Sequence, residues 1–212
     1  MKREVRVKVC GITSLEDARA AVSAGADWLG FNFYSGSPRF ITPSKAHRII
    51  EQLPRTVESV GVFVNEDTPE SVMKIAKAAG VTVVQLHGDE SPAYCKALKN
   101  LFVIKALRTS SDFRPEQAAQ YETNAILLDA FAGGARGGTG ETCDWLLARQ
   151  TCEMVPQLFL AGGLTPENVA EAIAAVKPFA VDVCSGVESA PGCKDAVRMR
   201  RFVAAARGTA WL

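Results

Sequence analysis

Cys10, at the end of the first hydrophobic run, is the residue whose type and place best suit chemistry in this chain. The run from Val5 to Val9 predicts a strand, Gly11 permits a sharp turn after it, and a helix is expected to begin near Ser14. Catalytic side chains of barrel enzymes lie at such strand ends, and a thiol becomes reactive on losing its proton. A small cysteine filling a gap in the core is the commoner case. Whether Cys10 is structural or catalytic therefore has to be judged from the other residues of the chain.

Polar and ionisable residues also follow the other predicted strands. Arg39 follows the second strand, His87 the fourth and Asp129 the sixth, while Asn65 and Arg108 follow the third and fifth. Asparagine and glycine alone would be ordinary turn residues. A thiol, a carboxyl group and an arginine together at one end of a barrel indicate a catalytic pocket.

Two small-residue pairs near the C-terminus predict a phosphate site. Gly162 and Gly163 come just before a predicted helix start at Thr165-Pro166, and Ser185-Gly186 follows the last predicted strand. Bare backbone N–H groups at a helix start attract phosphate, and barrels commonly bind it at the loops after strands seven and eight. Either pair alone could be a plain turn, but both at these loops indicate a small phosphorylated ligand.

The glycine-rich segment 131–140 directly follows the sixth predicted strand. It could be a floppy surface connection. A loop of this length in a compact barrel is more often a lid over the site. We expect a lid whose closure removes water from Asp129 and raises the pKa of its carboxyl group.

Short apolar runs alternate with helical segments along the whole chain. Most of these runs are continuously apolar, as strands covered on both faces should be. The predicted strands are Val5–Val9, Trp28–Phe33, Ser59–Val64, Thr82–Leu86, Phe102–Ala106, Ala125–Leu128, Leu158–Leu160 and Ala180–Val183. Helix starts with a hydroxyl cap and a proline are predicted at Thr42-Pro43, Thr68-Pro69, Ser91-Pro92 and Thr165-Pro166, with C-caps at Gly25 and Gly80.

Eight such units predict an α/β fold with a parallel sheet, either a (β/α)8 TIM barrel or an open doubly wound sheet. An open sheet would normally carry a Gly-x-Gly-x-x-Gly turn after its first strand, and Cys10-Gly11-Ile12-Thr13 is not one. The pattern therefore favours a single (β/α)8 barrel domain over residues 1–212, compact for this fold.

Composition narrows the function classes. The chain has 212 residues, 48% hydrophobic and 22% charged, with a net charge of +1, so neither nucleic acid nor an anionic membrane is expected as the main partner. The N-terminus does not resemble a signal peptide, and no apolar run reaches the roughly 18 residues of a membrane span.

Cysteine and histidine usage indicates the compartment and the metal content. The six cysteines form no Cys-x-x-Cys pair, and the two histidines are His47 and His87. We therefore expect no metal site, free thiols and a cytoplasmic location.

Nine segments in order resemble one known family. They are Lys8-Val9-Cys10-Gly11-Ile12, Gly30-Phe31 leading to Ser37-Pro38-Arg39, Val60-Gly61-Val62-Phe63, Val84-Gln85-Leu86-His87-Gly88, Leu127-Leu128-Asp129, Gly138-Thr139-Gly140, Ala161-Gly162-Gly163-Leu164, Asp182-Val183 and Ser185-Gly186-Val187-Glu188. Over about residues 5–205, the chain resembles the phosphoribosylanthranilate isomerases of tryptophan biosynthesis. Each segment is a modest signal, but the ordered set is specific.

The resemblance implies a cofactor-independent Amadori rearrangement of N-(5-phosphoribosyl)anthranilate, a small phosphorylated aminosugar. It makes Asp129 the general acid that protonates the furanose ring oxygen and Cys10 the general base at C2 of the sugar. It makes Arg39 the ligand of the anthranilate carboxylate and places Gln85 and His87 in the pocket wall. Members of the family are monomers or homodimers, so either state is expected.

The same resemblance assigns the phosphate to Gly162-Gly163 and Ser185-Gly186. Two positions depart from its usual pattern. Cys184 stands where serine is common, and Cys143 stands where an aromatic residue is usual. A thiol is a weak hydrogen-bond donor, but backbone N–H donors would remain, so we expect phosphate binding to survive.

The proposed base needs help, because a free thiol is mostly protonated at neutral pH. Lys8 lies two residues before Cys10, on the same side of the strand. Two arrangements are open: Lys8 lowers the pKa of the thiol, or it pairs with a strand-end carboxylate such as Asp182.

Other functions fit the residues less well. A metal-dependent epimerase needs paired histidine and acidic ligands, and with His47 in a helix only His87 is at a strand end. A Schiff-base aldolase needs a strand-end lysine, and Lys105 lies within the fifth predicted strand. For an indole-forming synthase, the required lysine acid and glutamate cannot be placed. A non-catalytic phosphate-binding module remains as the plain alternative.

Overall fold

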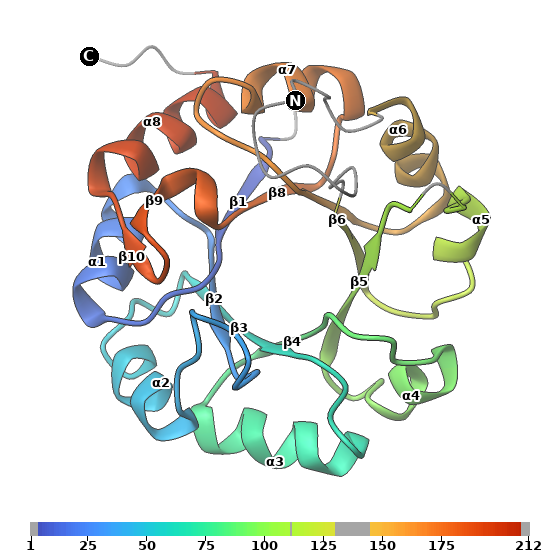
Figure 1. Cartoon of the computed structure of the whole chain (residues 1–212), viewed down its shortest axis with the longest axis horizontal. Helices are drawn as coiled ribbons and strands as arrows, with labels where there is room; N and C mark the ends of the chain where they lie inside the picture. The colour runs from blue at the N-terminus through green and yellow to red at the C-terminus, as the bar shows by residue number, and fades with distance from the viewer. Residues whose placement is uncertain (1–3, 111, 130–144, 209–212) are drawn as a thin grey trace.

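Eight parallel strands pair in chain order, and the last pairs with the first to close a barrel (Figure 1). The computed structural model describes residues 4–110, 112–129 and 145–208. The strands are β1 (Arg6–Val9), β2 (Trp28–Asn32), β3 (Glu58–Phe63), β4 (Val83–Leu86), β5 (Phe102–Arg108), β6 (Ala125–Asp129), β7 (Leu158–Ala161) and β8 (Ala180–Val183). The predicted (β/α)8 barrel is confirmed, and the strand bounds lie within one or two residues of the predicted ones.

Helices surround the ring of strands (Figure 1). They are α1 (Leu15–Ala24), α2 (Pro43–Ile50), α3 (Pro69–Ala79), α4 (Pro92–Ala97), α5 (Pro115–Ala118), α6 (Trp145–Met154), α7 (Val169–Val176) and α8 (Ala196–Arg207). The predicted hydroxyl caps Thr42, Thr68 and Ser91 each accept a backbone N–H three residues on, with proline at the first helical position. Gly25 and Gly80 end α1 and α3 with left-handed φ angles of 97° and 73°.

The predicted helix start at Thr165-Pro166 is wrong, because α7 begins at Val169 with Asn168 as its N-cap. The Asn168 side-chain oxygen accepts the N–H of Thr165 at 2.8 Å, and Thr165 Oγ1 accepts the N–H of Glu167 at 3.2 Å. These two bonds hold residues 165–168 as a turn. The glycine pair at 162–163 is therefore separated from the helix by this turn.

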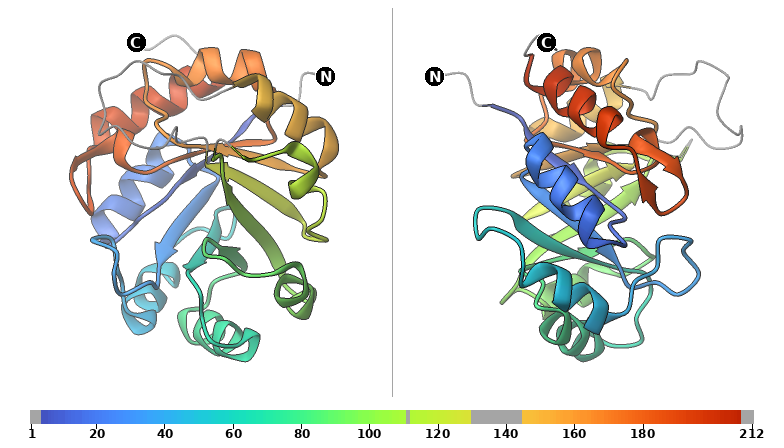
Figure 2. Two further views of the ribbon diagram at one scale, coloured as in Figure 1. Left: turned by 45° about the vertical axis from the view of Figure 1, so that its right-hand side comes forward. Right: turned by 90° about the vertical axis from the view of Figure 1, so that its left-hand side faces the viewer.

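A short hairpin after β8 was not predicted. A 3-10 turn, η1 (Ser185–Val187), leads into the antiparallel strands β9 (Glu188–Ala190) and β10 (Cys193–Lys194), and α8 follows. Strands of two or three residues carry too few side chains for an alternating pattern. The hairpin places residues of the last unit beside the start of the chain, and Figure 2 shows α8 (red) alongside α1 (blue).

The core has two parts, one between the barrel and the helices and one inside the barrel. Trp28 and Phe159 meet edge to face inside the barrel, with ring centroids 5.2 Å apart. Lys8 and Asp182 also lie in register, on β1 and β8, and both are buried. Side chains thus fill the barrel, and functional groups can gather only at its carboxyl-terminal mouth.

Candidate active site

Cys10 lies directly after β1, at the mouth of the barrel and next to β8. Its backbone N–H donates to Val183 O at 2.8 Å. Gly11 then turns the chain with φ 79°, and its N–H donates to Gly30 O at 3.0 Å. A Cβ at Gly30 would lie 2.6 Å from Cys10 Sγ, so this glycine makes room for the thiol. The predicted strand-end position of the cysteine is confirmed.

Lys8 forms a buried ion pair with Asp182 beneath this thiol, with Nζ 2.9 Å from Oδ1. Burial alone would lower the pKa of Lys8. The negative charge of Asp182, followed by that of Cys10 when ionised, outweighs burial and raises the lysine pKa above its ordinary value. Lys8 is therefore a permanent ammonium under the thiol.

The pKa of Cys10 lies above the ordinary thiol value. Burial is the largest cause and raises it, while the charge of Lys8 and a hydrogen bond from Lys8 lower it. Both arrangements left open for Lys8 therefore occur, since it pairs with Asp182 and also lowers the pKa of the thiol. Its charge offsets only part of the cost of burial.

Asp129 ends β6 at the same mouth, with β7 and β8 between its strand and β1. Its Oδ2 lies 3.6 Å from Nε2 of His87, which follows β4. Nδ1 of His87 lies 2.9 Å from the side-chain nitrogen of Gln85. Gln85 and Asp129 therefore lie next to opposite ring nitrogens of His87.

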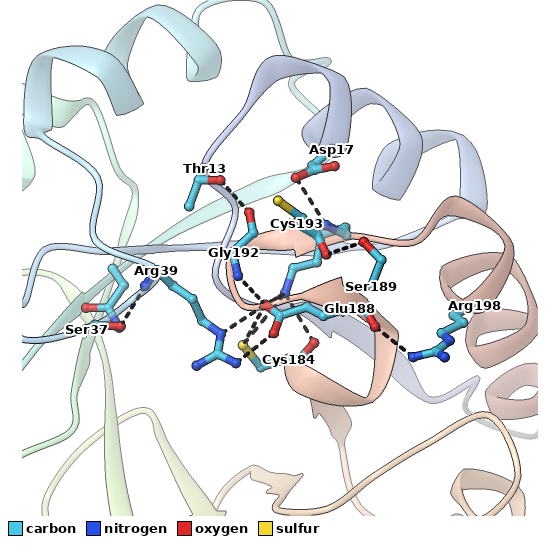
Figure 3. A network of polar contacts seen from close by, with 12 residues as sticks. Thr13, Asp17, Ser37, Arg39, Cys184, Glu188, Ser189, Gly192, Cys193 and Arg198 are labelled. Atoms are coloured by element: carbon cyan, nitrogen blue, oxygen red, sulfur yellow. Dashed lines mark hydrogen bonds and ion pairs between the residues drawn. The ribbon is translucent and has the colours of Figure 1, made fainter.

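Arg39 lies in the loop after β2 and is held by Glu188, the first residue of β9 (Figure 3). Its Nε and Nη2 donate to the two carboxylate oxygens at 2.9 and 2.7 Å. Lys194 Nζ donates to the same carboxylate at 2.8 Å and to Cys184 O at 3.2 Å. The arginine expected to hold a substrate carboxylate is thus already paired on one edge.

The two predicted phosphate loops are in contact with each other. A Cβ added at Gly186 would overlap the carbonyl oxygen of Leu164. Gly162 and Gly163 have φ angles of 86° and 63°, which favour glycine. Because α7 begins only at Val169, any phosphate donors of the first loop would be its own N–H groups rather than the helix end.

Two residues of the site had no assigned role in the sequence. Glu188 lies in the segment Ser185-Gly186-Val187-Glu188, where nothing in the sequence indicates a contact with Arg39. Lys194 is buried in β10, although lysine is usually exposed, and no local pattern marked it. The hairpin that brings both residues together is the reason they were missed.

Some expectations lie outside the described residues. The predicted lid over 131–140 and the unusual Cys143 belong to this part. Within residues 4–110, 112–129 and 145–208, no group of three or more histidine, cysteine or acidic residues is placed to hold a metal ion. Over the same residues, no helix has the length and apolar character needed to cross a membrane.

Comparisons with known proteins show which family this chain and its fold resemble. The family model of N-(5'-phosphoribosyl)anthranilate (PRA) isomerase matches residues 7–205. The chain is similar to N-(5'-phosphoribosyl)anthranilate isomerase from Geobacter sulfurreducens, with 52% identity over 204 residues, 96% of this chain and 99% of the relative. It is also similar to the crystal structure of phosphoribosyl anthranilate isomerase from Thermotoga maritima, with a TM-score of 0.89 and 46% identity over 96% of this chain and 99% of that one.

A second solved structure contains a bound small molecule. It is phosphoribosyl anthranilate isomerase in complex with reduced 1-(o-carboxyphenylamino)-1-deoxyribulose 5-phosphate. Its TM-score is 0.86, with 44% identity over 96% of this chain and 99% of that one.

Proposed function

The chain belongs to the N-(5'-phosphoribosyl)anthranilate isomerase family, and we propose that Cys10 and Asp129 perform the proton transfers of this isomerisation. The reaction converts N-(5'-phosphoribosyl)anthranilate into 1-(o-carboxyphenylamino)-1-deoxyribulose 5-phosphate. One observation supports the two roles above all. A thiol over a permanent ammonium and a carboxyl group facing His87 lie at one mouth of the barrel.

In the first step, Asp129 donates a proton to the furanose ring oxygen. The C1–O bond breaks, and the nitrogen lone pair forms the Schiff base at C1. His87, whose Nε2 lies 3.6 Å from Oδ2, is the polar neighbour of the carboxylate left after the transfer.

In the second step, the thiolate of Cys10 removes the hydrogen from C2. The electron pair of that C–H bond forms the C1–C2 double bond of an enolamine, and the iminium nitrogen accepts the displaced pair. The thiol then returns a proton to C1 while the C2 hydroxyl gives its hydrogen to the Asp129 carboxylate, which yields the ketone and restores both groups. Lys8 stabilises the thiolate that starts this step.

The remaining roles concern binding. We propose that Arg39 holds the anthranilate carboxylate, that Gly162-Gly163 and Ser185-Gly186 hold the phosphate, and that Gln85 supports His87 in the pocket wall. The relative solved with the reduced aminoketose phosphate supports a phosphorylated aminosugar as ligand. The cytoplasm is the proposed location, supported by the five free cysteines among the described residues.

The test is turnover of freshly prepared phosphoribosylanthranilate, followed by anthranilate fluorescence in the presence of a chelator. We expect Cys10→Ala and Asp129→Asn each to lower kcat by roughly 10²–10⁴-fold, because each removes one proton-transfer group. Circular dichroism and thermal unfolding should show that both variants keep the fold. Near-normal turnover by Cys10→Ala would remove the thiol from its role, and tight binding without turnover by the unaltered protein would favour the binding-module alternative.

A further inference from the structure

We propose that Glu188 is a positioning residue that holds the guanidinium of Arg39 ready for the substrate carboxylate. This inference rests on the proposed function, because it concerns how the substrate's aromatic acid is recognised. Figure 3 shows the contacts that carry it, at the point where the β9–β10 hairpin meets the loop after β2.

Arg39 and Glu188 form a bidentate ion pair. Nε and Nη2 of Arg39 each donate to a different oxygen of Glu188, at 2.9 and 2.7 Å. This fixes the plane of the guanidinium as well as its position. Nη1 has no partner among the described residues and points away from Glu188 (Figure 3), so it remains available to an incoming carboxylate.

The carboxylate of Glu188 is itself held in place. Lys194 Nζ donates to it at 2.8 Å and the N–H of Gly192 at 3.3 Å. The side chains of Glu188 and Lys194 are 5% and 0% exposed, whereas that of Arg39 is 23% exposed. Buried Glu188 and Lys194 therefore form a fixed support, and Arg39 is the accessible member of the cluster.

The β9–β10 hairpin, which carries Glu188 and Lys194, is hydrogen-bonded to neighbouring elements. Thr13 Oγ1 donates to Gly192 O at 2.7 Å, and the N–H of Lys194 donates to Asp17 Oδ2 at 3.3 Å. The carbonyl of Glu188 accepts from Arg198 of α8 at 2.7 Å. Contacts to the β1–α1 segment and to α8 thus hold Glu188 at a set distance from the barrel mouth.

The stem of Arg39 has a fixed path as well. A Cβ at Gly11 would lie 2.8 Å from Cδ of Arg39, so the stem packs closely over this glycine. The free arginine side chain would lose considerable rotamer freedom on binding a ligand. Here the packing of the stem and the bidentate contact with Glu188 fix the arginine rotamer before the substrate arrives. Binding of the substrate carboxylate therefore costs less side-chain entropy.

The charges also favour an anion. Arg39 and Lys194 carry two positive charges against the single negative charge of Glu188, so the cluster keeps a net charge of +1. The glutamate therefore orients the arginine without cancelling its attraction for the substrate carboxylate. Its removal should weaken substrate binding rather than the proton transfers.

The experiment is a double-mutant cycle of Glu188→Gln and Arg39→Ala, with kcat and KM measured on phosphoribosylanthranilate. We expect Glu188→Gln to raise KM about tenfold with kcat within about threefold, because a neutral amide cannot match the guanidinium fork. On the Arg39→Ala background, the same change should alter KM by less than about twofold, since coupled residues are not additive. With the phosphoribosyl derivative of aniline, which lacks the carboxylate, Glu188→Gln should leave KM unchanged.

Two further variants separate positioning from folding. Glu188→Asp keeps the charge that buried Lys194 requires but withdraws the carboxylate from Arg39, and it should raise KM severalfold. The matched control is Asp27→Asn, an acid-to-amide change at the opposite end of the barrel, where Asp27 pairs with Arg6 and Arg207. It should lower the melting temperature without changing KM.

An unchanged KM in folded Glu188→Gln and Glu188→Asp proteins, or an equal effect with and without Arg39, would overturn the positioning role. Failure of the proposed function would look different, because the unaltered protein would then not turn over phosphoribosylanthranilate at all.

Discussion

In the proposed mechanism Cys10 acts as a base, although its buried position disfavours the thiolate. Burial raises its pKa, and Lys8 recovers part of that shift through its charge and its hydrogen bond. Lys8 can do so because Asp182 keeps it protonated. Lys8, two positions before the thiol, thus increases the amount of thiolate present at a given pH over what burial alone would allow.

The pH dependence of the reaction should follow from this shift. A base acts only when deprotonated, and a raised pKa moves its deprotonation to higher pH. In the Asp129→Asn variant, where no general acid titrates in the opposite sense, kcat/KM should therefore increase with pH through the neutral range. The midpoint of the rise should lie above 9.0, the ordinary value for a thiol. The measurement is kcat/KM from pH 6 to 10.

Cys10→Ala on the Asp129→Asn background is the control for this profile, because it removes the titrating thiol and should abolish the rise. A rise with its midpoint well below 9.0 in the Asp129→Asn protein would contradict the shift and the role of Cys10 as the titrating base.

Single residues at strand ends could be predicted from the sequence, but their partners could not. Cys10 and Asp129 follow strands that are recognisable from local apolar runs. The contact of Arg39 with Glu188 joins residues 149 positions apart and depends on a hairpin with no local pattern. For Lys8, alternation predicts the side of the strand on which its side chain lies. It does not predict that the side chain contacts both Asp182 and Cys10.

At the scale of elements, the loop after β7 and the 3-10 turn after β8 pack as one unit. Gly186 lies so close to Leu164 that any side chain there has to displace one of the two loops. The pair of loops therefore behaves as a single phosphate-binding surface in the proposed function.

Gly186→Ala should disrupt this surface. We expect KM for the substrate and the inhibition constant of inorganic phosphate to rise together, each by at least about tenfold, because phosphate donors of one loop move relative to the other. Both constants can be measured in the fluorescence assay.

Gly208→Ala serves as the comparison for this substitution. Gly208 ends α8 with φ 67°, and a Cβ there would meet nothing within 4 Å. The change should cost about 1 kcal/mol of unfolding free energy and leave both constants unaltered. Unchanged phosphate inhibition in Gly186→Ala would contradict the assignment of the loops.

Elements with strong local signals were predicted well, and elements shaped by side-chain turns were not. Three of the four predicted hydroxyl–proline starts are helix caps, because the hydroxyl can reach the N–H three residues on. At Thr165 the neighbouring Asn168 competes for the backbone and delays the helix. Such competition depends on geometry that dipeptide patterns do not encode.

For the whole molecule, barrel closure depends on the seam between β1 and β8. Lys8 and Asp182 face each other across it as a buried ion pair. Eight regular units and the lack of a dinucleotide-binding turn were enough to predict a barrel. No local pattern indicates that the first and last strands pair, because that contact depends on the curvature of all eight.

Asp182→Asn should strongly destabilise the protein, by about 3–5 kcal/mol, because it leaves a buried ammonium without a negative partner. The double variant Lys8→Met with Asp182→Leu should recover most of this loss, since it removes both charges together. Urea unfolding gives the free energies. A loss below about 1 kcal/mol for Asp182→Asn would show that the seam does not depend on the pair.

The contact between β1 and β8 also limits how early the active site can form during synthesis of the chain. Lys8 and Asp182 are 174 residues apart, and Arg207 at the end of α8 binds Gly25 O and Asp27 near the start. On the ribosome, β1 can reach its native place beside β8 only after the last unit has emerged. Cys10, whose N–H donates to Val183 O of β8, therefore gains its native surroundings only when the ring closes.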